Sequence, residues 1–109
     1  MNQVELNFAR AARDEGIRRS ESRANEAIPG WSDLAFQFIQ LYAQRNRGKQ
    51  FIGRDVVLAA KAYGLIDPPN DKAWGGPMQR ASKAGVIRKV GVAQDPNRHC
   101  NPVPLWLAV

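Results

Sequence analysis

His99 and Cys100 are the residues whose types most directly suggest metal binding or thiol chemistry, and the chain has one histidine and one cysteine. A zinc site needs about four ligands, so this pair is too small a set. A catalytic Cys–His pair must meet across a pocket, whereas neighbouring residues in an extended loop point apart. The sequence therefore predicts neither a metal site nor a thiol enzyme, and a single cysteine cannot form an intramolecular disulfide.

Other enzyme signatures are also missing. Gly75-Gly76 lacks the surrounding GxxxxGK pattern that cradles phosphates in nucleotide-binding loops. The five acids of residues 30–109 are scattered, so they offer no ligand set for two-metal phosphoryl chemistry. These acids are Asp33, Asp55, Asp67, Asp71 and Asp95. We therefore expect a protein that is not an enzyme and that uses no cofactor or metal.

Charge is the strongest indication of a partner. The 109-residue chain has a formal net charge of +6. Residues 1–29 hold five arginines and five acids, whereas residues 30–109 hold eleven basic residues against five acids, which accounts for the whole excess. Such a balance favours a polyanion partner, most commonly nucleic acid, although a basic surface can also serve solubility alone.

The hydrophobic pattern predicts helices separated by Pro- and Gly-rich breakers. A strong amphipathic helix begins at Trp31, after Pro29-Gly30, and ends before a polar turn at Arg45–Gln50. Further helices are expected over about residues 3–26, 54–63 and 71–84. Gly64 suits the left-handed residue that ends a helix, and the helix over 71–84 stops at Gly85. The connector Asp67-Pro68-Pro69-Asn70 separates the last two helices.

Two strands are expected at the C-terminal end. Residues 86–92 (VIRKVGV) and 103–109 (VPLWLAV) alternate as strands do, and Val103, Leu105, Leu107 and Val109 share one face. The loop 93–102 would join them as a long antiparallel hairpin. The fold class is thus mainly α with a C-terminal β-hairpin (α+β). Trp31, Trp74 and Trp106 are expected in the core. With no apolar run of about 20 residues and no apolar leader, a cytoplasmic protein of a bacterial cell or phage-infected host is expected.

The order helix, helix, turn, helix, strand, basic loop, strand resembles the winged-helix variant of the helix-turn-helix domain. The resemblance covers residues 31–109, after an N-terminal helix and linker over residues 1–29. The block FIGRDVVLAAKAYGLIDPPNDKAWGGPMQRASKAGVIRKVG is similar to small winged-helix proteins of phage and prophage gene sets, above all in KAWGGPMQRASKAGVI. The resemblance implies a DNA-binding protein acting in transcription regulation or phage-type DNA replication, with double-stranded DNA as partner.

In that family the third helix usually enters the major groove, which implies a recognition helix at Asp71–Ala84. With Trp74, Met78 and Ala81 turned inward, the residues left outside or on the flanks are Lys72, Gln79, Arg80 and Lys83. Gln79 has the donor and acceptor pair that reads adenine, and Arg80 can fork onto guanine. Lys72 and Lys83 suit phosphate oxygens. All four could equally be ordinary solvated side chains.

The hairpin tip, or wing, of that family contacts the DNA backbone or minor groove. It corresponds here to Ala93–Pro102, where Arg98 is the best candidate and Asn97 lies beside it. The basic turn before the second helix could touch the backbone through Arg45, Arg47 and Lys49, and Arg54 opens that helix. Such a turn is otherwise an ordinary solvated loop.

Gly75-Gly76-Pro77 departs from an unbroken recognition helix, because a proline inside a helix costs roughly 3 kcal/mol. Either the helix kinks, or a one-turn segment at 71–75 precedes a helix that begins at Pro77 with Gly76 as its N-cap. A shortened helix favours the alternative function, a protein–protein interaction module that binds host replication or defence machinery.

The N-terminal helix carries a small apolar stripe formed by Val4, Phe8, Ala11 and Ala12. This stripe is too small for a stable obligate interface. We therefore expect this segment to pack on its own domain at most by its first half, and residues 16–29 to be mobile. The protein should be a monomer or a weak homodimer.

Overall fold

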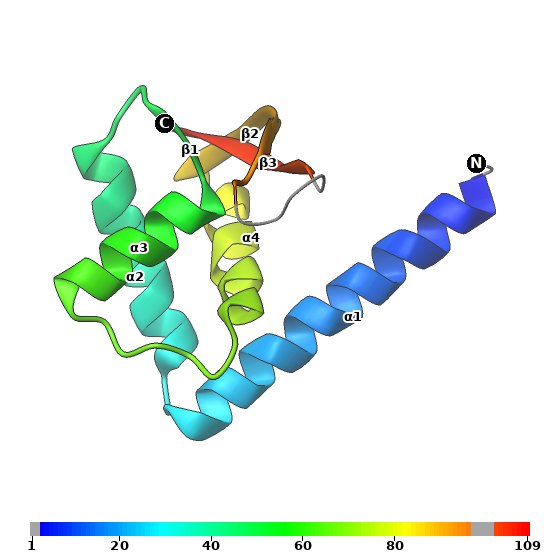
Figure 1. Ribbon diagram of the computed structural model, residues 1–109, viewed down its shortest axis with the longest axis horizontal. Coiled ribbons are helices and arrows are strands. Elements are labelled where there is room, and N and C mark those ends of the chain that lie inside the picture. The colour runs from blue at the N-terminus through cyan, green and yellow to red at the C-terminus, as the bar shows by residue number, and fades with distance from the viewer. Residues whose placement is uncertain (1–2, 97–101) are drawn as a thin grey trace.

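The computed structural model describes the backbone of residues 3–96 and 102–109, with side chains from Glu15 onward in these ranges. This part of the chain forms a mixed α+β fold with four α-helices, a 3-10 turn and three strands (Figure 1). In chain order the elements are α1 (Gln3–Ala27), α2 (Trp31–Arg45), β1 (Gln50–Ile52), α3 (Gly53–Tyr63), η1 (Asp71–Trp74), α4 (Gly75–Lys83), β2 (Ile87–Gln94) and β3 (Pro102–Ala108). The expected α+β class is confirmed, and β1 is an element that the sequence reading missed.

The strands form one antiparallel sheet in the order β1-β3-β2. The central strand β3 pairs Trp106 with Phe51 of β1 and Ala108 with Ile87 of β2. The pairing of β2 with β3 shifts register between Lys89 and Gly91. The predicted hairpin is therefore present, and β1 extends it to three strands.

The core face of the sheet is not the face that carries the alternating leucines. Trp106 and Ala108 are buried, whereas Val103, Leu105 and Leu107 are only half-buried on the opposite face. Successive strand residues point to opposite faces, so the more regular apolar stripe lies outside. The large indole of Trp106 fills the core position instead.

Aromatic packing joins α2 to the segment before α4. Trp31 is fully buried and lies edge-on to Trp74, with ring centroids 5.3 Å apart. Phe38 reaches the same cluster from the next turns of α2, at 6.5 Å from Trp74. Tyr42 packs on Phe51 of β1, and burial, with a smaller effect of the Asp55 carboxylate, raises the pKa of Tyr42 above its usual value of 10.0. All three tryptophans are in the core, as expected.

The second half of α1 is the half that packs on the domain, so the expectation of packing by the first half is wrong. Ala24 is completely buried and joins the core cluster. Ile17 lies against Gly75 at the start of α4. In Figure 1 the ribbon of the first half of α1 projects beyond the remaining elements. The charged composition of residues 16–26 hid this contact, because only every third or fourth residue faces the domain.

Candidate nucleic-acid interface

The segment from η1 to α4 has the inward and outward faces predicted from its sequence. Trp74, Met78 and Ala81 are buried, whereas Lys72, Gln79 and Lys83 are exposed. Of the two arrangements left open for Pro77, the structure has a one-turn segment followed by a helix. The α-helix begins at Gly75 rather than Pro77, with Trp74 as its N-cap.

Pro77 is tolerated because it lies in the first turn of α4. The N–H groups of a first turn have no partner within the helix, so the missing N–H of proline costs little there. The 3-10 turn of η1 leads directly into the helix, with the Gly75 N–H donated to the Lys72 carbonyl. Asn70 caps this turn by accepting the Lys72 N–H at 2.9 Å. The helical segment is therefore continuous, although α4 itself has only 9 residues.

Helix α1 crosses the outward face of this segment at the two glycines. A Cβ atom added to Gly75 would lie 3.1 Å from the Ile17 side chain, and one added to Gly76 would lie 2.4 Å from the Glu21 carboxylate carbon. Gly76 follows Lys72 by four residues and precedes Gln79 by three, so all three share one face. The crossing therefore separates Lys72 from Gln79 and Lys83.

Hydrogen bonds to the first turn of α2 hold α1 at this crossing. The Ser32 hydroxyl donates to the Glu21 carboxylate at 2.8 Å, and the Ser32 N–H donates to the Asn25 side-chain oxygen at 3.0 Å. The Asn25 amide also donates to the Ser32 hydroxyl at 3.0 Å. Asn25 thus satisfies a free N–H at the start of α2, where the N-cap Gly30 offers no side chain. The position of α1 is fixed by polar contacts as well as by packing.

Arg80 is engaged with α2. Its guanidinium forms an ion pair with Asp33 at 2.8 Å and lies 4.2 Å from the centre of the Phe36 ring. Both charged side chains of the pair are more than half exposed, so the pair adds little stability. Arg80 can reach a base only by leaving Asp33, and the weak pair makes that exchange inexpensive.

The polar stripe of α2 runs beside α4, which the sequence reading did not connect with the site. Asp33 near the start of α2 pairs with Arg80, and Gln40, Gln44 and Arg47 near its end line the same depression as Gly85 just after α4. The two helices therefore lie side by side and in the same direction. Their facing polar residues enclose a shallow depression of about 220 Å³. The regular spacing of the glutamines in α2 is the sequence feature that could have indicated this polar stripe.

The turn after α2, the end of β3 and the turn after α4 are joined by backbone hydrogen bonds next to this depression. The Gly48 N–H donates to the Ala108 carbonyl at 2.9 Å, and the Ala108 N–H donates to the Lys49 carbonyl at 3.1 Å. The Val109 N–H donates to the Val86 carbonyl at 3.2 Å. We call the exposed cations around this junction the basic end: Arg45, Arg47, Lys49 and Lys83. The structure thus brings together Lys83, Arg47 and Lys49, three of the candidates identified from sequence.

The remaining candidates lie elsewhere. Arg54 is exposed in the first turn of α3, directly after β1. Arg98 and Asn97, the proposed wing contacts, fall outside the described residues.

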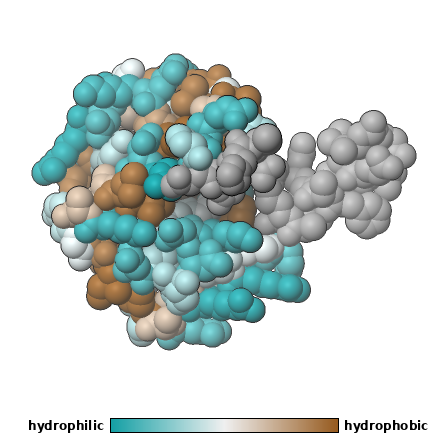
Figure 2. All heavy atoms as spheres, viewed as in Figure 1, coloured by the Kyte–Doolittle hydropathy of each residue, from teal (hydrophilic) through white to brown (hydrophobic). Residues whose placement is uncertain are grey.

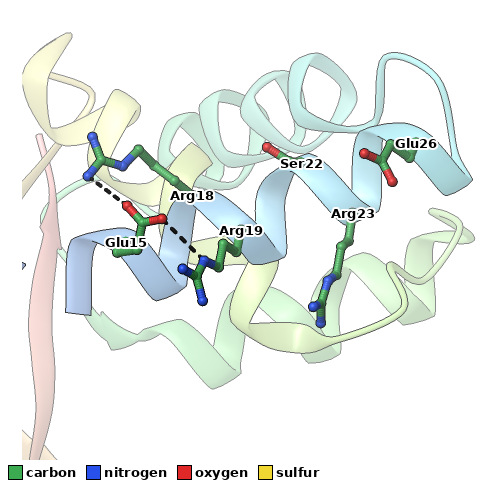
Figure 3. Close-up of a pocket in the computed structure, with 6 residues that line it drawn as sticks. All are labelled: Glu15, Arg18, Arg19, Ser22, Arg23 and Glu26. Atoms are coloured by element: carbon green, nitrogen blue, oxygen red, sulfur yellow. Dashed lines mark hydrogen bonds and ion pairs between the residues drawn. The ribbon is translucent and has the colours of Figure 1, made fainter. Parts of the chain in front are cut away.

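The outer side of α1 forms a second, open depression of about 400 Å³ (Figure 3). Glu15 pairs there with Arg18 at 3.4 Å and Arg19 at 3.2 Å, while Arg23 points away from this group. Ser22 and Glu26 complete the lining. All of these charges are exposed and nearly balanced, so this surface has no strong preference for an anion or a cation.

The described residues contain no cluster of histidine, cysteine or acids able to hold a metal ion. Within the same ranges, no helix has the length and apolar character needed to cross a membrane. Comparison of the chain with protein-family models, curated proteins and solved structures finds no match, so its function has to be inferred from its own residues.

Proposed function

We propose that this chain is a DNA-binding protein of winged-helix type, acting in transcription regulation or phage-type DNA replication. One observation carries the proposal. Residues 34–54 and 72–94 contain no acid, and together they hold nine of the eleven cations of residues 30–109. The side-by-side packing of α2 and α4 brings parts of these two stretches onto one surface, on which Asp33 pairs with Arg80 and the Glu21 carboxylate lies against Gly76. Support also comes from the β2–β3 hairpin that follows α4.

In this proposal the C-terminal half of α4 faces the duplex. Gln79 offers its carboxamide to a base edge, and Lys83 offers its ammonium to a phosphate. Arg80 exchanges Asp33 for a guanine or a phosphate. Lys72 lies on the far side of α1, so we assign it a peripheral phosphate contact. Because α1 covers part of the outward face of α4, the exposed part of that face is short. This favours a shallow contact dominated by the DNA backbone.

Salt dependence tests the proposal. Binding of a fluorescent 20-base-pair duplex should weaken between 50 and 200 mM salt, with log K falling by about 0.9 for each phosphate neutralised. Gln79→Ala should alter discrimination between duplexes while leaving this slope unchanged, whereas Lys83→Ala should lower the slope by about one phosphate. No binding at 50 mM salt and micromolar protein would refute a DNA-binding function.

A protein–protein interaction module is the second candidate. It is favoured by α1 covering part of the outward face of α4, and by three exposed apolar side chains on α3 and just beyond it. Leu58, Tyr63 and Ile66 are 49%, 65% and 64% exposed. A host or phage protein captured from bacterial lysate after nuclease treatment, and lost on Leu58→Ser with Ile66→Ser, would support this candidate over DNA binding.

A further inference from the structure

The depression between the ends of α2 and α4 has the chemistry of an anion site. Its polar lining residues are Arg47, Gln40 and Gln44, which carry a guanidinium and two carboxamides. Its other walls are Ala43, Gly85, Val86 and Val109, so the lining has no carboxylate side chain. A planar guanidinium matches two oxygens of a phosphate at once, and neighbouring carboxamides can donate to the others.

Gly85 lines the depression just after α4. This residue adopts a left-handed conformation with φ of 77°, which other residues rarely tolerate, and a Cβ there would meet no atom within 4 Å. Ala43 is buried and Val86 half-buried beneath it. A floor of this kind keeps water from one side of a bound group, which strengthens charge-assisted hydrogen bonds.

Helix dipoles oppose an anion here, so their size has to be weighed. Both α2 and α4 end at the depression, and each helix end contributes roughly half a negative charge. The Tyr42 and Ala43 carbonyls accept hydrogen bonds from Asn46, and the Arg80 and Ser82 carbonyls accept from the turn after α4. Against these two half-charges stands the full positive charge of Arg47, which lines the depression, and Arg45, Lys49 and Lys83 are exposed close in the chain to residues that line it.

We propose that this depression binds a phosphate group, and that in the working complex this group belongs to the backbone of the duplex that contacts α4. The inference rests on the proposed DNA-binding function. Gln79 and Gly85 are six residues apart, which corresponds to about 9 Å along the helical direction. The bound phosphate therefore lies in the same stretch of duplex as the base that Gln79 reads.

Arg45 provides a matched control for Arg47. Both are exposed arginines at the end of α2, but only Arg47 lines the depression. We expect Arg47→Ala to weaken duplex binding about tenfold and to lower the salt slope by about 0.9, as for the loss of one phosphate contact. Arg45→Ala should weaken binding less than threefold, and Arg47→Lys should restore part of the loss because the charge returns without the fork.

Titration of the wild-type chain with inorganic phosphate, followed by backbone amide NMR, tests the depression independently of DNA. The amide resonances of Gly85 and Val86 should shift as phosphate is added to the wild-type chain, and they should not shift in Arg47→Ala. Equal losses of duplex affinity in Arg45→Ala and Arg47→Ala would overturn the site and leave a diffuse basic surface. If duplex DNA binds without shifting the amide resonances of Gly85 and Val86, the phosphate site is also overturned, while the proposed DNA-binding function stands.

The two proposals fail differently. If phosphate shifts Gly85 and Val86 but no duplex binds, the proposed function is wrong and the assignment to a DNA backbone falls with it, leaving a site for a free phosphate. If acidic lipid vesicles compete for the depression more strongly than duplex DNA does, the assignment to a nucleic-acid backbone is likewise wrong.

Discussion

Gly76 is the residue at which α1 comes closest to α4, and its missing side chain makes room for the Glu21 carboxylate. Replacing it with alanine would force that carboxylate to turn, because a Cβ would lie 2.4 Å from its carbon. The hydrogen bond from Ser32 to Glu21 would then be lost, at a cost of about 1 kcal/mol.

Gly16 offers the matched control, since a Cβ at this position of α1 would meet no atom within 4 Å. Alanine is favoured over glycine inside a helix by about 1 kcal/mol, so Gly16→Ala should raise the free energy of unfolding by that amount. Gly76→Ala should show none of this gain in urea denaturation, because the lost hydrogen bond offsets it. Equal gains in the two variants would contradict the close packing of α1 on α4.

At the scale of elements, the docking of α1 divides the helix into two halves with different environments. Ile17, Glu21 and Ala24 contact the domain, so amide hydrogen exchange should be slow over residues 17–27. Residues 3–14 should exchange faster, since their ribbon projects beyond the remaining elements. This reverses the mobility expected from sequence for residues 16–29.

Weakening the anchor should reduce the difference between the halves. Ser32→Ala removes both hydrogen bonds of the hydroxyl group while keeping the backbone N–H. Exchange over residues 17–27 should then accelerate, whereas exchange in α3 should not change. Equal exchange along the whole of α1 in the wild-type chain would show that the docked position is not maintained in solution.

Helices α2 and α3 could be predicted from sequence because their apolar residues repeat every three or four positions and clear breakers bound them. Gly64 ends α3 as expected, with φ of 98° and its N–H donated to the Ala60 carbonyl. Strand β1 could not be predicted, because three residues carry no periodicity and the strand exists through pairing with β3. The outward orientation of Leu105 and Leu107 was hidden for a similar reason, since alternation identifies two faces without saying which is buried.

At the scale of the whole molecule, the expected assembly state depends on how much exposed apolar surface is contiguous. On the face shown in Figure 2, hydrophilic side chains separate the apolar ones into small patches. A stable dimer usually buries about 800 Å² on each partner. We therefore expect sedimentation of a monomer at tens of micromolar, with at most weak association.

Removal of residues 1–14 should leave this behaviour unchanged, and it is a safer truncation than removal of residues 1–29. The longer deletion would remove Ala24 from the core and Ile17 from its contact with Gly75. A tight dimer that becomes monomeric in the shorter truncation would contradict the expected monomer and assign an assembly role to the first half of α1.

The candidate site was predictable only where it depends on one element. The outward positions of Gln79 and Lys83 follow from the helical period of α4. The ion pair between Arg80 and Asp33 joins residues 47 positions apart, and the meeting of Arg47 with Gly85 requires α2 and α4 to lie side by side. Such contacts come from tertiary packing, which a periodicity within one segment does not specify.

The register shift between Lys89 and Gly91 has a consequence for the behaviour of the protein at high concentration. An irregular edge strand is a poor template for pairing with a strand of another molecule, and charged side chains along it add repulsion. Arg88 and Lys89 are both exposed on β2, and the opposite edge of the sheet is the three-residue β1. The sheet therefore has no long, regular free edge, and the folded chain should resist growth into fibrils even where Val90 and Val92 meet the solvent.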